Sequence, residues 1–441
     1  MPTPADRRPD DKLLMGLNVL SHGIYPTAWH ADSTAGLPTA QPDYWRRVAQ
    51  AAEAARFDAL FLADHYYLTD PGPGTILTPI DPVSLWADIA QHTSRIGLVV
   101  TASTTYNDPW ELATRILTLS AVAEGRVAWN AVTSFGDDAP LNYGLEDILE
   151  RSQRYARADE FVRTVTQVWT ALETQQGRRV DGDFFRFTVP AGVGLPTRSL
   201  PPVLQAGGSP QGKRLAGRYA NGVFSAETTI PTARQHYLEV KQHAVDAGRN
   251  PADVKILPGL TLTLGDTVAA ARAKVDRHAE LGGRGGEETT FAKLFGLDID
   301  DFDRDAPLPP GTLEGVPPEL FRGSIGFRDA LAQLVKANAH LSIRELLKEL
   351  RYLGTGHASF VGTPEQLAAR FEEWFRAGAA DGFILMPGVV LDDLPILADE
   401  VFPLLRKRGL IREDYAETET FASLIGLDAD ENRLVGLASP R

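Results

Sequence analysis

The sequence predicts an α/β fold, a (β/α)8 barrel of the TIM type with long insertions. Short apolar runs and longer amphipathic segments alternate along the 441 residues. The apolar runs are mostly continuous, which is typical of parallel strands buried on both faces. Eight such runs suit a closed barrel. The first run is followed by SHGIYPTAWH, which lacks the G-x-G-x-x-G motif of many open doubly wound sheets. A closed barrel is therefore the expected architecture.

The expected strands are the eight apolar runs. In chain order they are Leu14–Ser21, Ala59–Asp64, Ile96–Ser103, Arg126–Thr133, Pro202–Ala206, Gly222–Ala226, Ile256–Leu264 and Gly382–Met386. Alternation with helices implies right-handed crossovers, and hence a parallel sheet.

Amphipathic segments between these runs are the expected helices. They are Pro42–Ala55, Asp81–Thr93, Pro109–Ala123, Ser152–Leu172, Pro210–Tyr219, Thr232–Ala247 and Asp266–Leu281. The second begins with Asp81 and Pro82, which suit the N-cap and the first helical position.

Several segments interrupt the alternation. Long loops at 23–41 and 65–80 follow the first two strands and are expected on the C-terminal rim, where barrel enzymes build their active sites. An insertion at about 173–201 contains DGDFFRFTV, which predicts a small hairpin. A second insertion at about 282–360 turns helical at 326–352. Long insertions in a compact domain are usually lids, binding loops or oligomer contacts.

The expected domain organisation is simple. We predict a disordered N-terminal tail over 1–12, a single barrel with its insertions over 13–427, and a C-terminal tail over 428–441.

Composition narrows the function classes. The formal net charge of −14 disfavours nucleic acid and anionic membrane surfaces as partners, because both repel negative charge. The chain has no cysteine, which excludes disulfides, thiolate nucleophiles and cysteine-bound metal centres. No set of histidine and carboxylate ligands gathers at strand ends, so no metal site is predicted. The polar start lacks an apolar signal segment and no long apolar run follows, so we expect a cytoplasmic protein.

Polar side chains end two of the expected strands. Asp64 closes FLAD, where a carboxylate is either a helix cap or a ligand group. Thr101, Ser103 and Thr104 end the third strand in TASTTYNDP. Their hydroxyls suit hydrogen bonds to a ring or a phosphate, but ordinary strand propensity and capping explain them equally.

Two further clusters suit an anion. Arg151 and Tyr155 share one helix face beside Arg154, which suits phosphate, although a surface helix with ion pairs gives the same pattern. The turn in QAGGSPQGKRLA, with Gly208 and Ser209, leaves a strand and opens a helix, so its N–H groups can face an anion. A lone glycine-rich turn is weak support, and this one does not form a G-x-S-x-G nucleophile elbow.

Taken together, these segments resemble the bacterial luciferase-like flavin monooxygenases. Within that family they are most similar to the branch of nitrilotriacetate monooxygenase, dibenzothiophene-sulfone monooxygenase and the flavin-dependent component of pristinamycin synthase. The resemblance runs from about residue 13 to 427, and the segment 285–360 matches least. It rests on FDALFLAD, TSRIGLVVTASTTYNDPWELA, EGRVAWNAVTS, RYARADEFVRTVTQVW, QAGGSPQGKRLAGRYANGVF, VGTPEQLAARFEEWFRAGAADGFIL and FPLLRKRGLIREDY.

The resemblance implies a barrel that holds flavin mononucleotide (FMN) at its C-terminal mouth. It implies that Asp64 and Thr101 contact the flavin ring or ribityl chain and that Asn130 lies near the ring. Tyr155 and Ser209 are then expected at the phosphate, with Ser103 and Gly208 also among the cofactor contacts. Relatives often carry a histidine where this chain has Arg151, and arginine also binds phosphate.

The implied chemistry is a two-component monooxygenation. A separate NAD(P)H:flavin reductase supplies reduced FMN (FMNH2), which reacts with O2 at C4a to give a peroxide or hydroperoxide that oxidises a small organic molecule, with C–N or C–S cleavage the commonest outcome. A homodimer or higher homo-oligomer is implied as well. A deazaflavin- or FMN-dependent dehydrogenase on the same barrel and a non-catalytic flavin-binding protein remain alternatives.

No single residue stands out as the acid or base. His22 and His65 follow the first two strands, and histidine titrates near neutral pH, so they are the candidate catalytic residues. Either can equally be a histidine satisfied within its loop. Trp29, Tyr66 and Tyr106 suit stacking on flavin or substrate, although aromatic loop residues more often pack.

Overall fold

Eight parallel strands close into a barrel in the computed structural model of the chain. The structure describes residues 11–64, 66, 79–134, 139–195, 197–282, 288, 291, 295–314, 325–353, 356–417 and 419–427. Around the barrel the strands are β1 (Leu14–Asn18), β2 (Ala59–Leu62), β3 (Gly97–Ser103), β4 (Val127–Val132), β7 (Val203–Ala206), β8 (Gly222–Ser225), β9 (Lys255–Leu264) and β11 (Gly382–Pro387). β11 pairs with β1 and closes the ring, which confirms the predicted fold class.

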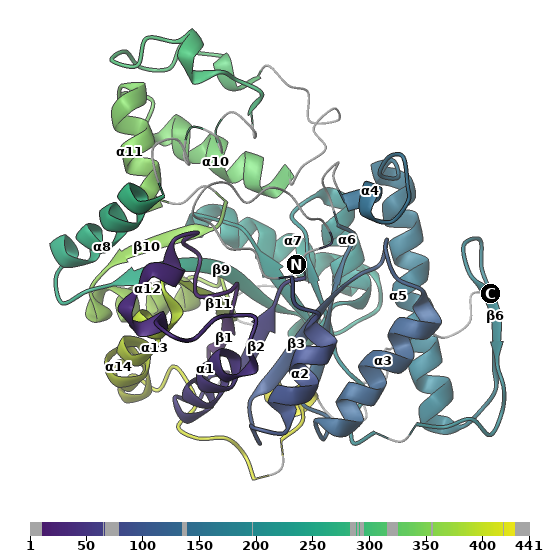
Figure 1. Cartoon of the computed structure of the whole chain (residues 1–441). Coiled ribbons are helices and arrows are strands. Elements are labelled where there is room, and N and C mark those ends of the chain that lie inside the picture. The colour runs from purple at the N-terminus through teal and green to yellow at the C-terminus, as the bar shows by residue number, and fades with distance from the viewer. Residues whose placement is uncertain are drawn as a thin grey trace.

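Helices cover the outside of the barrel (Figure 1). They are α1 (Pro42–Ala54), α2 (Pro82–Ala90), α3 (Pro109–Val122), α5 (Arg151–Thr174), α6 (Pro210–Tyr219), α7 (Ile230–Asp246), α8 (Val268–Leu281), α12 (Pro364–Arg376), α13 (Val390–Ile396) and α14 (Phe402–Lys407). Short helices are α4 (Ala139–Asn142), η2 (Ala28–His30), η3 (Asp32–Thr34), η4 (Pro251–Asp253), η5 (Ile299–Asp301), η6 (Thr312–Glu314) and a π-turn at Leu397–Val401. Asp81 caps α2 as expected, since its carboxylate accepts a hydrogen bond from Ser84 N at 2.8 Å.

A ninth parallel strand, β10 (Ala358–Gly362), was not predicted. It pairs with Leu260–Leu264 of β9, whereas β8 pairs with Lys255–Pro258 of the same strand. One edge of β9 is thus covered first by β8 and then by β10. The run ASFVG is short and adjoins the second insertion, so it gave no separate strand signal.

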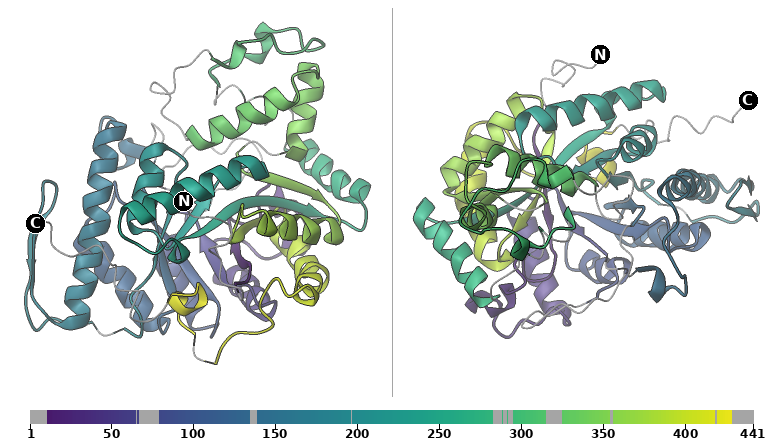
Figure 2. Two further views of the ribbon diagram at one scale, coloured as in Figure 1. Left: turned by 180° about the vertical axis from the view of Figure 1, so that it is seen from behind. Right: turned by 90° about the horizontal axis from the view of Figure 1, so that it is seen from above.

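The first insertion contains the predicted hairpin, formed by β5 (Arg178–Asp181) and β6 (Arg186–Val189). The second insertion lies over the C-terminal end of the barrel (Figures 1 and 2) and has a hydrophobic cluster of its own that includes Phe291, Leu331 and Leu346. Its helical part, expected over 326–352, forms two helices, α10 (Ile325–Ala337) and α11 (Ile343–Leu353). The break is set by a capping box: Ser342 Oγ accepts from Glu345 N, and the Glu345 carboxylate accepts from Ser342 N.

The barrel is closed at its N-terminal end by the C-terminal segment. The short helix α15 (Phe421–Leu424) packs into an interior cluster that includes Phe61, Val99 and Ile384. A side chain at Gly97 would lie 2.7 Å from the ring of Phe421, so that glycine permits the close approach. The C-terminal mouth is therefore the end of the barrel that is left for a ligand.

None of the described helices combines the length and the apolar character that a membrane span requires. Residues 1–10 and 428–441, which hold most of the two expected tails, lie outside the described residues.

Candidate active site

Two buried polar side chains meet inside the barrel near its mouth. Thr101 on β3 and Asn130 on β4 are register partners, and Asn130 Nδ2 donates to Thr101 Oγ1 at 3.1 Å. The amide oxygen of Asn130 and that of Asn18, on β1, are buried without a hydrogen-bond partner among the described residues. A buried polar atom is costly unless it is paired, so these oxygens are placed to accept hydrogen bonds from a ligand.

Ser103 organises the turn after β3. Its hydroxyl lies 2.8 Å from Ser134 Oγ and accepts hydrogen bonds from the backbone N–H of Thr105 and Tyr106. Its own N–H donates to the phenol of Tyr66 at 2.5 Å. The side chain is therefore engaged within the protein, in the capping role left open by the sequence.

Asp64 lies at the rim of the mouth and affects the pKa of a neighbouring tyrosine. Burial, and then the nearby carboxylate of Asp64, raise the pKa of Tyr66, which keeps this phenol protonated. Tyr66 lies beside Tyr106, and Tyr106 stacks on Tyr143 with ring centroids 4.5 Å apart. Asp64 does not cap the next helix, since Asp81 does. His65, the other predicted residue of this segment, lies outside the described residues.

A second polar cluster lies at the start of α6. Ser209 is the N-cap of α6, and its Oγ accepts a hydrogen bond from Gly212 N at 3.1 Å. The phenol oxygen of Tyr155 on α5 lies 3.1 Å from the same Oγ. Gly208 lies in the turn between β7 and α6. The helix N-terminus, its N–H groups and two hydroxyls together form a cradle suited to an anion.

Arginines stand beside this cradle. Arg151 opens α5 on the same face as Tyr155, and Arg154 is buried, with its Nε lacking a hydrogen-bond partner among the described residues. Burial lowers the pKa of Arg154, and the positive charge of Arg151 lowers it further. Guanidinium groups in this setting favour a phosphate or carboxylate.

His22 is engaged by its own loop. Its Nε2 lies 2.8 Å from the carbonyl oxygen of Leu37, and its ring packs edge-on against Tyr44 at 4.7 Å. The imidazole therefore ties the long loop after β1 to α1.

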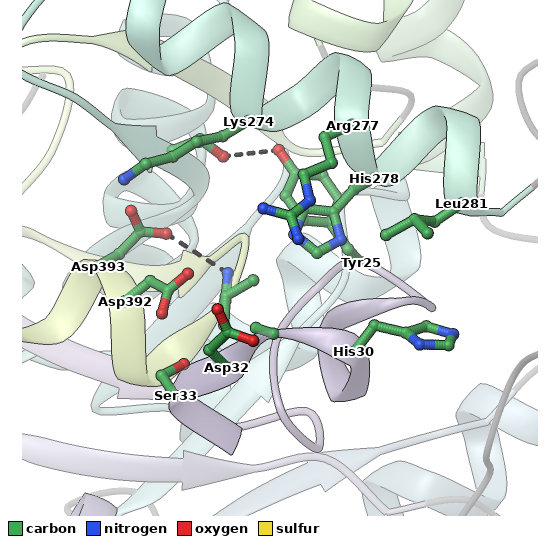
Figure 3. A pocket seen from close by; sticks show the side chains of 13 residues that line it. Tyr25, His30, Asp32, Ser33, Lys274, Arg277, His278, Leu281, Asp392 and Asp393 are labelled. Carbon is green, nitrogen blue, oxygen red and sulfur yellow. Dashed lines mark hydrogen bonds between the residues drawn. The ribbon is translucent and has the colours of Figure 1, made fainter. Parts of the chain in front are cut away.

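A charged pocket of about 230 Å³ lies at the rim, between the loop after β1, the end of β9, α8 and α13 (Figure 3). The Tyr25 hydroxyl forms a hydrogen bond with Thr263 Oγ1 at 2.6 Å, and the Tyr25 ring stacks on that of His278. Figure 3 shows Arg277 and His278 across the pocket from Asp392 and Asp393. Both signs of charge therefore line one recess.

The structure brings the predicted residues together in two pairs. Thr101 contacts Asn130, and Tyr155 contacts Ser209. β4, which carries Asn130, pairs with β7, which leads into Ser209. The two pairs thus lie on neighbouring strands at one end of the barrel, and Asp64 follows β2, the strand beside β3.

Sequence reasoning missed three titratable residues near the mouth. Glu227 follows β8 as Asp64 follows β2, so the same signal was available for it. His236 on α7 pairs with Glu227 over 2.8 Å. His357 precedes β10, the strand that was not predicted, and so could not be placed.

Known proteins resemble this chain along most of its length. The luciferase-like monooxygenase family matches residues 24–381. The chain is 32% identical to N-acetyl-S-(2-succino)cysteine monooxygenase of Bacillus subtilis, over 96% of this chain and 98% of that protein. It is 31% identical to the nitrilotriacetate monooxygenase of Aminobacter aminovorans, over 90% of this chain and 93% of that protein. Dibenzothiophene-sulfone monooxygenase and pristinamycin IIA synthase also match, which confirms the branch named from the sequence.

Solved structures give the same result. The structure of the EDTA monooxygenase from Chelativorans sp. BNC1 superposes with a TM-score of 0.77 at 29% identity, over 95% of this chain and 99% of that one.

Proposed function

Because the chain belongs to the luciferase-like monooxygenase family, we propose that it is the oxygenase component of a two-component system. It takes FMNH2 from a separate NAD(P)H:flavin reductase and uses O2 to oxidise a small organic molecule, with cleavage of a C–N or C–S bond. The prediction of a flavin-dependent monooxygenase is confirmed at the level of the family. The reductase, the form of the cofactor and the bond that breaks belong to the proposal.

The observation that carries the proposal is the arrangement of two different binding surfaces on neighbouring strands. Asn130 and Asn18 offer buried, unpaired amide oxygens inside the barrel, which suits the N–H groups of a flavin ring. The cradle of Tyr155, Ser209 and the start of α6 suits the phosphate. A planar ring with hydrogen-bonding edges joined to a phosphate fits both surfaces.

The residues present thus fit FMN. In the proposal, Asn130, Thr101 and Asp64 hold the ring and the ribityl chain, and Ser103 supports them through the turn after β3. Tyr155, Ser209 and the N–H of Gly208 hold the phosphate, with Arg151 balancing its charge. When bound, reduced FMN supplies the two electrons that activate O2 for transfer of one oxygen atom.

The chain's own contribution is to position the reactants and to keep water out. The interior cluster and α15 close the barrel from below, so the reaction space opens at the mouth. Tyr66, Tyr106 and Tyr143 form an aromatic wall at the rim. The second insertion lies above (Figure 1). Exclusion of water protects reactive oxygen chemistry from unproductive decay.

The substrate is proposed to be small and polar. The pocket of Figure 3 presents Lys274 and Arg277 together with Asp32 and Asp392, so it suits a molecule that carries charged groups. Its relatives include enzymes named for N-acetyl-S-(2-succino)cysteine and for nitrilotriacetate. A polar organic acid with a C–N or C–S bond is therefore the class to test first.

The decisive experiment measures O2 uptake and product formation with purified protein, a flavin reductase, NADH, FMN and a panel of such acids. Substrate-dependent product that disappears when the reductase or O2 is omitted supports the proposal. Substrate oxidation that proceeds without O2 would select the dehydrogenase, and tight binding of oxidised FMN without any oxygen chemistry would select a flavin carrier.

Assembly belongs to the proposal as well. By analogy with relatives we propose a homodimer or higher homo-oligomer, and light scattering on the purified chain tests it. A monomer across the micromolar range would contradict it.

A further inference from the structure

The barrel wall contains a seam beside β9. Its edge is covered by β8 as far as Pro258 and by β10 from Leu260 onward, so the change falls at Gly259. His357, directly before β10, lies in this seam. A Cβ at Gly259 would be 2.4 Å from His357 Nδ1, so the glycine leaves the space that the imidazole uses.

The imidazole of His357 is presented to the inside of the barrel. Its ring stacks on Phe224, with centroids 4.8 Å apart and an interplanar angle of 11°. Phe224 packs against the interior cluster and lies 5.3 Å from the ring of Phe61. His357 therefore faces the barrel interior, from which the proposed reaction space opens towards the mouth; it does not line the pocket of Figure 3.

A buried carboxylate–histidine pair lies behind this histidine. Glu227 Oε1 is 2.8 Å from His236 Nδ1, and the two side chains are only 15% and 2% exposed. His236 Nε2 and the hydroxyl of Thr228 are buried with no hydrogen-bond partner among the described residues. A purely structural pair is normally fully hydrogen-bonded, because each unpaired buried group is destabilising.

Burial sets the protonation state of His357. It lowers the pKa of the imidazole to about 4, and a hydrogen bond to the Ser225 backbone and then the Glu227 carboxylate oppose this. From α7, Glu239 acts on His236, and Glu239 is itself paired with Lys213 of α6 at 2.6 Å. The imidazole is therefore neutral at physiological pH and able to accept a proton, with a carboxylate nearby to balance the charge that results.

We propose that His357 is the residue that exchanges a proton with the bound substrate, and that the buried pair of Glu227 and His236 positions it and supplies the balancing charge. The proposal rests on the proposed function. In the step itself, one proton leaves an O–H or N–H group of the substrate and binds an imidazole nitrogen. No electrons move between protein and substrate.

The first test needs no turnover. The protein is labelled with 15N in its histidines, and the His357 signals are identified by their loss in His357→Gln. We expect His357 to stay neutral down to pH 5. Its titration midpoint should be lower in Glu227→Gln, because the carboxylate favours the charged imidazole. Addition of oxidised FMN should shift the His357 signals. His243, half-buried on α7, is the internal control. A His357 that titrates near pH 6.5 and ignores both changes would overturn the proposal.

The second test is kinetic, under the conditions of the coupled assay. We expect His357→Ala to lower kcat about 100-fold and added imidazole to restore part of it, and Glu227→Gln to lower kcat about tenfold with little change in KM. His243→Gln is the matched control and keeps full activity. A melting curve for each variant separates misfolding from chemistry, and His357→Gln is the second variant if the alanine protein is unstable.

The two proposals fail in different ways. An active wild type whose kcat is unchanged in His357→Ala would overturn the role of His357 alone. A wild type without any oxygen chemistry would overturn the proposed function, and the NMR titration would then still decide whether His357 is the neutral imidazole at the mouth that responds to Glu227.

Discussion

The hydroxyl oxygens of Tyr155 and Ser209 lie 3.1 Å apart although the residues are 54 positions apart in the chain. Tyr155 comes from α5 and Ser209 caps α6, so the contact joins two crossover helices at the C-terminal end of the barrel. Two hydroxyls and a helix N-terminus that converge on one point favour an anion. The contact is thus the geometric basis for the phosphate end of the proposed cofactor site.

Removal of the Tyr155 hydroxyl tests the phosphate end of the proposed cofactor site. We expect Tyr155→Phe to weaken FMN binding about 10-fold to 100-fold, because a hydrogen bond to a charged group contributes about 1.5–3 kcal/mol. Riboflavin lacks the phosphate, so its affinity should not change, which makes it the internal control. Fluorescence titration measures both. Equal losses for the two ligands would place Tyr155 at the ring and not at the phosphate. Ser209→Ala is less informative, since loss of the N-cap also destabilises α6 by about 1 kcal/mol.

The flavin-ring end of the proposed cofactor site is tested by replacing both Thr101 and Asn130. In Thr101→Val/Asn130→Leu the mutual hydrogen bond and the unpaired amide oxygen disappear together. Loss of both partners to apolar groups of similar shape is nearly neutral or stabilising, so we expect an unchanged or higher melting temperature. FMN and riboflavin should both bind about tenfold more weakly. Unchanged riboflavin affinity would show that the ring does not lie against Asn130.

The alternation of apolar and amphipathic segments determined which site residues could be predicted from the sequence. Thr101 and Ser209 follow from it, because they lie at or just after the end of an apolar run and parallel strands bring those ends together, whereas Asn130 was predicted from the family resemblance. His357 could not be placed, since its strand is short and pairs with a β9 edge that two strands share. The split between α10 and α11 depends on the local capping box at Ser342, which a helical periodicity does not reveal.

The packing of Phe421 against Gly97 at the closed N-terminal end of the barrel predicts that the stability effects of substitutions at these two residues are coupled. Phe421→Ala should destabilise the protein by about 3–5 kcal/mol, because it empties a fully buried ring site. Gly97→Ala should also destabilise, since its Cβ would lie 2.7 Å from that ring. In the double variant the new methyl group enters the vacated space, so the combined loss should be smaller than the sum. Denaturant unfolding of the four proteins gives the coupling, and strict additivity would contradict the packing described for α15.

Asp393 predicts a pH dependence of stability. Its carboxylate accepts hydrogen bonds from Leu264 N and Val389 N, and burial raises its pKa to about 7. The folded state therefore binds this proton more tightly than the unfolded state. The contribution of Asp393 to the free energy of unfolding is largest at low pH. It is lost as pH rises from about 4 to 7, at up to about 1.4 kcal/mol per pH unit. Asp58, whose pKa burial raises to about 6, contributes with the same sign. Melting temperatures of wild type and Asp393→Asn at pH 5 and pH 8 isolate Asp393: the variant should gain relative to wild type at pH 8. A constant difference would show that Asp393 does not titrate in this range.

The charged pocket of Figure 3 makes the substrate prediction specific. Arg277 reaches into it from α8, opposite Asp392 and Asp393. If it binds a carboxylate of the substrate, Arg277→Gln removes a charge-assisted hydrogen bond and should raise KM about 10-fold to 100-fold. FMN affinity should stay unchanged, because the phosphate cradle at the start of α6 follows β7, two strands from β9 around the ring, and none of its residues lines the pocket. Arg272→Gln is the matched control, since Arg272 lies on the same helix but stacks on Tyr352 at 4.6 Å. A rise in KM for both variants would indicate a general effect on α8, and no rise for Arg277→Gln would place the polar end of the substrate elsewhere.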